Sequence, residues 1–327
     1  MSGMADSDQA NAAARKAKGE MVRPTSKVRH ALGTAEFPAV PGRYHLYVGF
    51  NCPWCHRVVL ARAALGLEAS VSMDVAFPTR SSEPDARGRD GLWIFKPDGM
   101  AVPNGAVVSF PECTADTVGG KPTVAEIYDA EGVEQQSVPL LYDRVAKRIV
   151  NNESAELVRM LSAHAAALGG TPLDLYPADR RAAIDAANDF IYHDINNGAY
   201  KAGFVSKQAI YEEAYHAYFA ALDRVEAALA ESKFVVGDTV TEADLRLFPT
   251  IFRHDPVYYT RFKLNQAMIR DYPHLWRWLH TMYADVPGVR ATSDASYLQH
   301  CKQGYFGRSN TNTVPLGPPG YPECYWS

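Results

Sequence analysis

The stretch Tyr44–Leu67, YHLYVGFNCPWCHRVVLARAALGL, decides the fold of this chain. Its first seven residues alternate and are rich in aromatic residues and valine, which predicts a strand over 44–50. Residues 56–67 carry apolar side chains at helical spacing, which predicts a helix. The turn between them holds Cys52-Pro53-Trp54-Cys55, so the Cys52 sulfur is expected at a helix N-terminus. Free backbone N–H groups and the helix dipole favour a thiolate there, and the sequence therefore predicts a nucleophilic, redox-active cysteine.

Two other interpretations of the cysteine pair have to be weighed. A CxxC motif can be half of a zinc site, and a buried pair can be purely structural. The three remaining cysteines, Cys113, Cys301 and Cys324, stand alone, and no second CxxC or HxxxH follows. We therefore expect thiol chemistry and no metal, because the strand–turn–helix context is the one that such chemistry needs.

Composition limits the class of protein. The 327 residues are 47% hydrophobic and 21% charged, as in a globular protein that can form two domains. A net charge of −4 gives no electrostatic reason to expect nucleic acid or a membrane surface as partner. No apolar run approaches the roughly 20 residues of a membrane span. Five cysteines, an odd number, do not suggest a disulfide framework, so a reducing cytoplasmic location is expected.

The first half of the chain predicts an α/β domain. Residues 1–40 are polar and weakly periodic and are interpreted as a mobile N-terminal arm. Residues 41–165 give a strand, the CPWC helix, a second strand, a long loop over 76–120 and a strand pair that ends at a helix opened by Asn152, Glu153 and Ser154. Pro139 stands at the start of one of these strands, and a cis Val138–Pro139 bond would explain its position.

The second half predicts an all-helical domain over 170–303. Amphipathic patterns cover 178–195 and 206–231, with Ser206 as an expected N-cap. Thr241 and Asp244 form a capping box before another helix, and residues 273–284 predict a further one. The Gly- and Pro-rich residues 304–327 are expected to wrap the surface without regular structure.

Several strings of the chain resemble the glutathione transferases, and within them the Xi class, the glutathionyl-hydroquinone reductases. The strings occur in the family's order between about residues 40 and 320: the CPWC helix start, Ile149–Ser154 (IVNNES), Ile195–Phe204 (INNGAYKAGF), Thr241–Phe248 (TEADLRLF), Asp255–Tyr258 with Arg261–Lys263, and Val314–Pro318. The resemblance implies a thioredoxin-like N-terminal domain, an all-α C-terminal domain and a homodimer.

The resemblance also implies a set of site residues. Cys52 matches the family's nucleophile. The backbone of Val138 and Pro139 would pair with the cysteinyl peptide of glutathione, Glu153 and Ser154 would hold its γ-glutamyl end, and Trp93 would lie beside it. Tyr200 and Tyr258 match tyrosines of the acceptor pocket, where they suit a phenolic substrate.

Simpler structural roles remain open for most of these residues. Glu153 and Ser154 could only cap a helix, Tyr200 and Tyr258 could belong to the core, with Tyr259 as a rival, and Trp93 could anchor a loop. Asp244 is expected to be structural, because capping explains it fully.

The chain departs from the family pattern at three places. Cys55 stands where the family has Ala or Gly, and a second thiol could resolve a mixed disulfide internally. Gln135 and Gln136 stand where a basic residue is usual before the Val-Pro pair; Lys121, Arg144 or Arg148 could compensate. Arg261 replaces a histidine, so the acceptor site is expected to differ from the family norm.

The sequence therefore predicts a reductase that uses glutathione as co-substrate and removes glutathione from glutathionyl-hydroquinones through a Cys52 mixed disulfide. Two alternatives within thiol chemistry are a glutaredoxin-like dithiol oxidoreductase using Cys52 and Cys55, and glutathione-dependent aryl-ether cleavage or dehalogenation. A non-catalytic scaffold with the transferase fold is a third alternative, but a scaffold does not require an intact CPWC.

Overall fold

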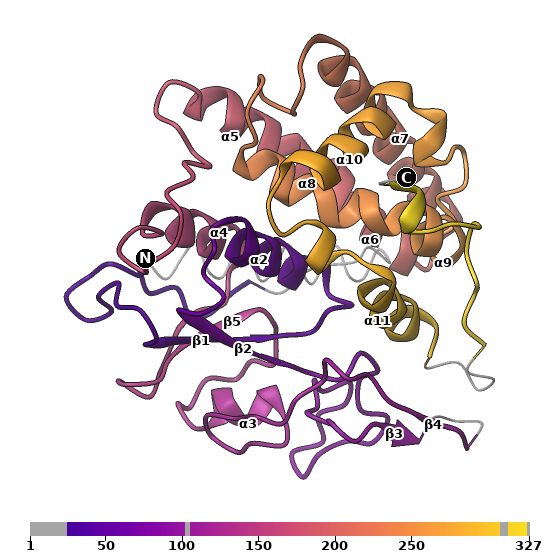
Figure 1. Ribbon diagram of the computed structural model, residues 1–327. Helices are drawn as coiled ribbons and strands as arrows, with labels where there is room; N and C mark the ends of the chain where they lie inside the picture. Colours follow the sequence, from indigo (N-terminus) through magenta and orange to yellow (C-terminus); the bar gives the residue numbers. More distant parts are fainter. Residues whose placement is uncertain (1–24, 102–104, 308–312, 326–327) are drawn as a thin grey trace, which may run out of the picture.

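The computed structural model describes residues 25–101, 105–307 and 313–325 (Figure 1). The first part of the expected N-terminal arm and parts of the expected C-terminal tail therefore lie outside the described residues.

The N-terminal part is built on a four-stranded sheet with the strand order β2-β1-β5-β6. β1 pairs parallel to β2 and antiparallel to β5, and β5 pairs antiparallel to β6. The strands are β1 (Tyr44–Val48), β2 (Val71–Val75), β5 (Leu140–Asp143) and β6 (Arg148–Asn151). Helices α2 (Pro53–Ala64) and α4 (Ser154–Ala163) cover one face of the sheet, and α3 (Val124–Asp129) lies on the other (Figure 1). This is the predicted thioredoxin-like arrangement.

The described part of the N-terminal arm follows the end of β6. The His30 N–H donates to the Val150 carbonyl at 2.8 Å, and the Asn152 N–H donates to the Val28 carbonyl at 3.2 Å. Ser26 Oγ donates to a carboxylate oxygen of Glu153 at 3.0 Å. The segment over 25–30 is thus hydrogen-bonded to the start of α4, which the sequence pattern did not indicate.

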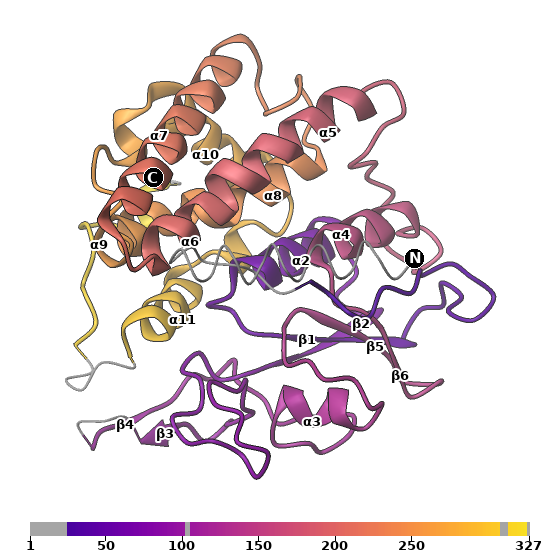
Figure 2. The same cartoon turned by 180° about the vertical axis from the view of Figure 1, so that it is seen from behind.

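The C-terminal part is helical, as predicted (Figure 2). Its elements are α5 (Arg181–Phe190), η1 (Ile191–Asn196), α6 (Asn197–Phe204), α7 (Gln208–Glu231), α8 (Glu242–Arg253), η2 (His254–Tyr258), α9 (Tyr259–Arg261), η3 (Ile269–Asp271), α10 (Pro273–Asp285), η4 (Arg290–Thr292), α11 (Ala295–Phe306) and η5 (Glu323–Tyr325). The expectation that Ser206 caps a helix is wrong, because α7 begins one residue later and Lys207 is its N-cap. Helix α11 was not predicted.

The long loop over 76–120 forms a small lobe beside α11 (Figures 1 and 2). Its short strands β3 (Met100–Ala101) and β4 (Val107–Val108) pair, and Phe77, Phe110 and Cys113 form a separate apolar cluster. Glu112 accepts hydrogen bonds from Ser296 and, at 3.1 Å, from the ring of His300. These contacts attach the lobe to α11.

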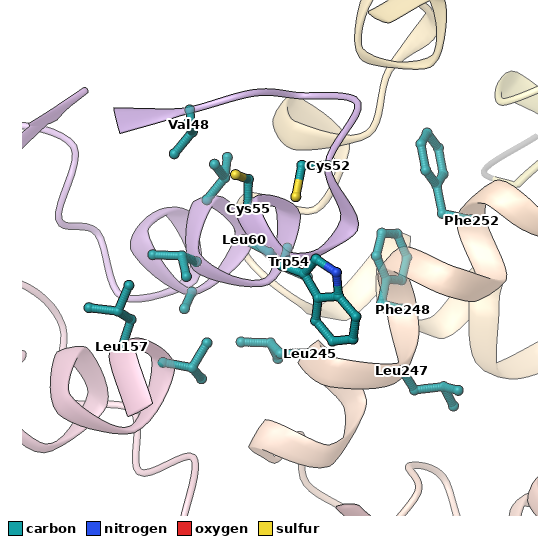
Figure 3. Packing of buried hydrophobic residues seen from close by; sticks show 14 of the residues in the cluster. Val48, Cys52, Trp54, Cys55, Leu60, Leu157, Leu245, Leu247, Phe248 and Phe252 are labelled. Carbon is teal, nitrogen blue, oxygen red and sulfur yellow. The ribbon is translucent and has the colours of Figure 1, made fainter. Parts of the chain in front are cut away.

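Helix α2 is buried along almost its whole length between the sheet and α8. Val58 and Leu60 are fully buried, and even His56 and Arg57 expose at most 2% of their surface. Trp54 of α2 lies against Leu245 and Phe248 of α8 (Figure 3). Since one apolar cluster runs through both parts of the chain, the start of α2 lies where the two domains meet.

The predicted capping box of α8 is confirmed, with Thr241 and Asp244 as its members. The buried Asp244 carboxylate accepts hydrogen bonds from the backbone N–H groups of Thr241 and Val235, both at 2.9 Å. It also accepts one from the indole of Trp278 at 2.9 Å, so it connects α8 to α10.

Replacement of Asp244 by alanine is expected to lower the free energy of unfolding by about 3 kcal/mol or more, because four buried donors, the Thr241 hydroxyl included, lose their acceptor. Asp189→Ala is the matched control: its side chain is 78% exposed, and a change within about 0.5 kcal/mol is expected. Chemical denaturation of both variants measures the difference. Equal stability of the two variants would contradict a structural role for Asp244.

Candidate functional site

Cys52 is the N-cap residue of α2, and Pro53 is its first helical residue. Proline is favoured there because its missing N–H is one that the helix leaves unpaired anyway. The Cys52 sulfur lies 3.8 Å from the Val138 carbonyl oxygen, and 8% of the residue surface is exposed. The sulfur therefore lies at the helix N-terminus and next to the backbone that precedes Pro139, where a thiolate is favoured and a thiol ligand can reach it.

Cys55 lies one turn further into α2 and is fully buried. Its sulfur accepts a hydrogen bond from the Gly49 N–H at 3.4 Å. Burial raises the pKa of the Cys55 thiol well above its usual value, and the neighbouring Cys52 thiol raises it further. Cys55 is therefore a protonated thiol at neutral pH, close to the nucleophile but closed off from solvent.

Trp93 packs against the backbone that leads into the CPWC turn. A Cβ atom on Gly49 would lie 2.4 Å from the Trp93 ring, so only glycine allows this close approach. The Arg80 guanidinium lies over the other side of the ring, 3.7 Å from its centroid. Trp93 exposes only 2% of its surface and is held between the Gly49 backbone and Arg80.

The other expected glutathione residues lie at the start of β5 and the start of α4. The Val138–Pro139 bond is cis, which accounts for a proline at the start of this strand. Glu153 is the N-cap of α4, and its carboxylate accepts the Ala155 N–H at 3.3 Å as well as the Ser26 hydroxyl. The first turn of α4, which begins at Ser154, presents free N–H groups of the kind that bind a carboxylate.

The segment with Gln135 and Gln136 has a basic neighbour that sequence reasoning missed. Lys27 donates its backbone N–H to the Gln135 side chain at 3.0 Å and its ammonium group to the Glu134 carbonyl at 2.8 Å. Nothing in the sequence indicates this contact, because 107 positions separate Lys27 from Glu134.

The sequence offered three cations that could replace the missing basic residue before Val138, and the structure gives each of them other contacts or another position. Arg148 forms an ion pair with Glu36, Lys121 donates its backbone N–H to Asp116 at 2.8 Å, and Arg144 is exposed in the turn between β5 and β6. Lys27 is therefore the cation with a hydrogen bond to the segment just before Val138.

Three phenol groups meet in front of the Cys52 loop. Tyr200 of α6 is hydrogen-bonded to Tyr305 of α11, and the hydroxyls of Tyr305 and Tyr258 lie 3.2 Å apart. The Tyr200 ring lies 6.5 Å from the Trp54 ring, and burial, followed by the charge of Cys52, raises the pKa of Tyr200. The structure thus brings the two expected tyrosines together near the nucleophile.

Burial keeps these phenols protonated. It raises the pKa of Tyr200 to about 12, and it raises the pKa values of Tyr258 and Tyr305 well above their usual range. All three side chains are therefore protonated phenols at neutral pH, and the row as a whole has a proton to donate.

Tyr305 is a further site residue that sequence reasoning missed. It lies in a stretch that was expected to have no regular structure, and no motif marks it. A Cβ atom on the preceding Gly304 would lie 2.3 Å from the Asn51 side chain, so this glycine lets α11 press against the residue next to Cys52. Arg261 donates to the Tyr305 carbonyl at 3.0 Å and holds the same turn of α11 from the other side.

The described residues offer neither a metal site nor a membrane span. They contain no group of three or more His, Cys, Asp or Glu side chains that could hold a metal ion. Within the same residues, every helix is too short or too polar to cross a membrane.

Comparison with known proteins identifies the family. Residues 208–281 match the family described as "Glutathione S-transferase, C-terminal domain". The chain is 38% identical over 307 residues to glutathionyl-hydroquinone reductase PcpF of Sphingobium chlorophenolicum, covering 92% of this chain and 90% of that protein. It is 36% identical over 288 residues to glutathionyl-hydroquinone reductase YqjG of Escherichia coli K12, covering 87% and 80%.

A solved structure agrees with these relatives. The glutathione transferase Xi from Phanerochaete chrysosporium superimposes with a TM-score of 0.79 at 35% identity, covering 92% of this chain and 94% of that chain.

Alkylation of the native protein at pH 7.5 is expected to modify Cys52 first. Cys55 and Cys301 are fully buried, and burial raises the pKa of Cys113 to about 12 and that of Cys301 to about 11. Peptide mass spectrometry after brief treatment with iodoacetamide measures the order of labelling, and Cys52→Ser is expected to lose the fast phase. Fast labelling of another cysteine would contradict the assignment of the reactive thiol.

Proposed function

The chain belongs to the Xi class of glutathione transferases, and from this premise we propose that it removes glutathione from glutathionyl-hydroquinones, with free glutathione as co-substrate. The observation that carries the proposal is the place of the Cys52 sulfur at the start of α2, in front of three joined phenol groups. A nucleophilic sulfur and phenolic donors are the two parts that reductive removal of a thioether from a phenol requires.

The reaction begins at Cys52. Its thiolate forms a disulfide bond with the sulfur of the bound thioether, and the carbon–sulfur bond breaks. The electron pair of that bond stays on the ring carbon, which takes up one proton, and the hydroquinone leaves. Tyr200 and Tyr258, joined through Tyr305, orient the phenol and supply the proton.

Free glutathione completes the cycle. Its thiolate attacks the glutathione sulfur of the mixed disulfide, oxidised glutathione leaves, and the Cys52 thiolate is restored. One thioether substrate and one glutathione thus give one hydroquinone and one oxidised glutathione. Cys55 is not needed for this balance.

We assign the binding of glutathione to residues at the start of β5, at the start of α4 and beside Cys52. The backbone of Val138 and Pro139 pairs with the cysteinyl peptide, and Trp93 lies beside it. Glu153 takes the γ-glutamyl ammonium, and Ser154 with the start of α4 takes the carboxylate of the same end. Lys27 lies at the segment before Val138 and takes the glycyl carboxylate at the other end.

Other parts of the proposal concern the whole molecule. We expect a homodimer in the cytoplasm, a glutathione-binding domain over 41–165 and an acceptor-binding domain over 170–303. The homodimer is expected from the family, and the reducing compartment from the five cysteines.

One specific observation favours a second candidate function, a dithiol route. The Cys52 thiol lies close enough to Cys55 to raise the pKa of the Cys55 thiol, after the larger effect of burial, and a glutaredoxin-like reductase of glutathione disulfides would use such a pair. The burial of Cys55 opposes this route, because a resolving thiol has to ionise.

Intact-protein mass spectrometry after mixing with a glutathionyl-hydroquinone, without free glutathione, tests the proposed function. One glutathione adduct together with released hydroquinone is expected. Cys52→Ala is expected to release nothing, and Cys55→Ser to behave like the unsubstituted protein.

Two outcomes would contradict this route. Release with loss of two hydrogens and no adduct, turning into a stable adduct in Cys55→Ser, would establish the dithiol route instead. Unchanged release in Cys52→Ala would remove Cys52 as the nucleophile.

Lys27→Gln is expected to raise the KM for glutathione about fivefold, since an exposed ion pair contributes about 1 kcal/mol. The glycyl amide of glutathione, which lacks the terminal charge, should bind equally well to both proteins. Lys207→Gln, an exposed lysine at the start of α7, is the control and should change neither KM. A similar loss with the amide would contradict the assignment of Lys27 to the glycyl carboxylate.

A further inference from the structure

Arg253, the last residue of α8, is a buried cation with no carboxylate partner among the described residues. Its guanidinium donates to the Phe50 carbonyl at 2.8 Å, to the Pro249 carbonyl at 2.9 Å and to the His56 ring at 2.8 Å. Its Nε atom has no hydrogen-bond partner there. Since a guanidinium stays protonated in proteins, a full positive charge is buried at this point.

The partners of Arg253 enclose the Cys52 loop. Phe50 precedes Cys52 by two residues, and His56 follows it by four. One guanidinium therefore joins both ends of the loop to the last turn of α8. Arg253 thus connects the helical domain to the two ends of the loop that carries Cys52.

His56 leaves the charge of Arg253 uncompensated. Burial, followed by the charge of Arg253, holds the pKa of His56 well below its usual value, so the ring is neutral. Because Nδ1 accepts from Arg253, the proton is on Nε2, which donates to the Ser293 hydroxyl at 3.1 Å. His56 thus serves as an acceptor for Arg253 and not as a base for Cys52.

Most of the titratable groups around Arg253 are thiols and phenols. They are neutral when protonated, and a nearby positive charge stabilises them only in their ionised form. From α11, Cys301 shares the Phe50 carbonyl at 3.7 Å, and Tyr297 lies with its ring centroid 5.8 Å from the guanidinium carbon. The charge of Arg253 lowers the pKa values of both, although burial raises them overall.

Three other titratable groups near Arg253 are phenols, which are also neutral when protonated. Tyr200, Tyr258 and Tyr305 also have their pKa values lowered by the charge of Arg253, against a larger effect of burial. The nearby Asp255 carboxylate is engaged elsewhere, by the Ile269 N–H at 2.8 Å and the Tyr321 hydroxyl. Within the part of the chain that the structure describes, the buried charge therefore faces thiols and phenols and no neutralising anion.

We infer that Arg253 is a positioning residue that fixes the Cys52 loop to α8 and supplies the positive potential that keeps the Cys52 sulfur ionised. This inference rests on the proposed function only in taking Cys52 as the nucleophile. The role goes beyond the helix N-terminus, because the cation comes from the helical domain.

The pH dependence of Cys52 alkylation tests this role without any hydroquinone. Rates with iodoacetamide, followed on the Cys52 peptide, are measured between pH 5 and 10. Arg253→Met is expected to raise the apparent pKa of Cys52 by on the order of one unit and to slow alkylation about tenfold below it. Arg253→Lys keeps the charge and is expected to keep the profile, while the turnover number falls because a lysine cannot hold both ends of the loop.

Arg246→Met is the matched control. Arg246 belongs to the same helix and is largely buried, but its ion pair is with Glu242 at 2.9 Å and not with the Cys52 loop. Its removal should leave the Cys52 profile unchanged. A profile in Arg253→Met that matches the unsubstituted protein would overturn the inference.

The test remains decisive if Arg253→Met does not fold. Arg253→Lys then decides alone: an unchanged Cys52 profile with slower turnover supports the positioning role, and an unchanged profile with unchanged turnover overturns it. Failure of the proposed function would show differently, as normal Cys52 ionisation without any release of hydroquinone.

Discussion

The contact of α2 with α8 is the interaction on which the rest of the structure depends. α2 has no solvent-facing stripe: it packs on the sheet and α4 on one side and on α8 on the other, and its two central valines and Leu60 are buried. A helix that is buried on all sides, with even the polar side chains of His56 and Arg57 enclosed, is stable only inside a larger core. The two domains therefore share one core, and the N-terminus of α2, with Cys52, lies where they meet.

Local patterns explain what the sequence could predict. The strand before Cys52, the helix after it, the Val138–Pro139 pair and the Thr241–Asp244 box each depend on residues within one turn or one strand. The same locality identified Glu153 as the residue that opens α4. These elements place the Cys52 thiol, the Val138–Pro139 pair and the start of α4. Their arrangement around the sheet follows from short connections between neighbouring elements.

The parts that sequence reasoning missed depend on contacts between distant positions. Tyr305 belongs to a helix whose glycine breaks the apolar pattern, and it reaches the site only because α11 is held against Asn51 and the lobe. Lys27 lies in a polar segment whose place is set by hydrogen bonds to β6 and α4. Arg253 follows an apolar run, and the acidic residue near it in sequence, Asp255, is hydrogen-bonded to Ile269 and Tyr321 and not to Arg253. For each of these residues, the partner is far away in the sequence, and no local pattern predicts the contact.

The linked phenols of Tyr200, Tyr305 and Tyr258 have a consequence that follows from counting protons. Each of the three hydroxyls has one proton, and two of these protons are donated in the two hydrogen bonds between the hydroxyls. The third proton takes no part in these bonds. When the direction of the two bonds reverses, the spare proton moves from one end of the row to the other without any side chain changing place. The three hydroxyls thus form a proton relay that works in both directions. The available proton can be at Tyr200 or at Tyr258, and a proton donated at one end can be replaced from the other end.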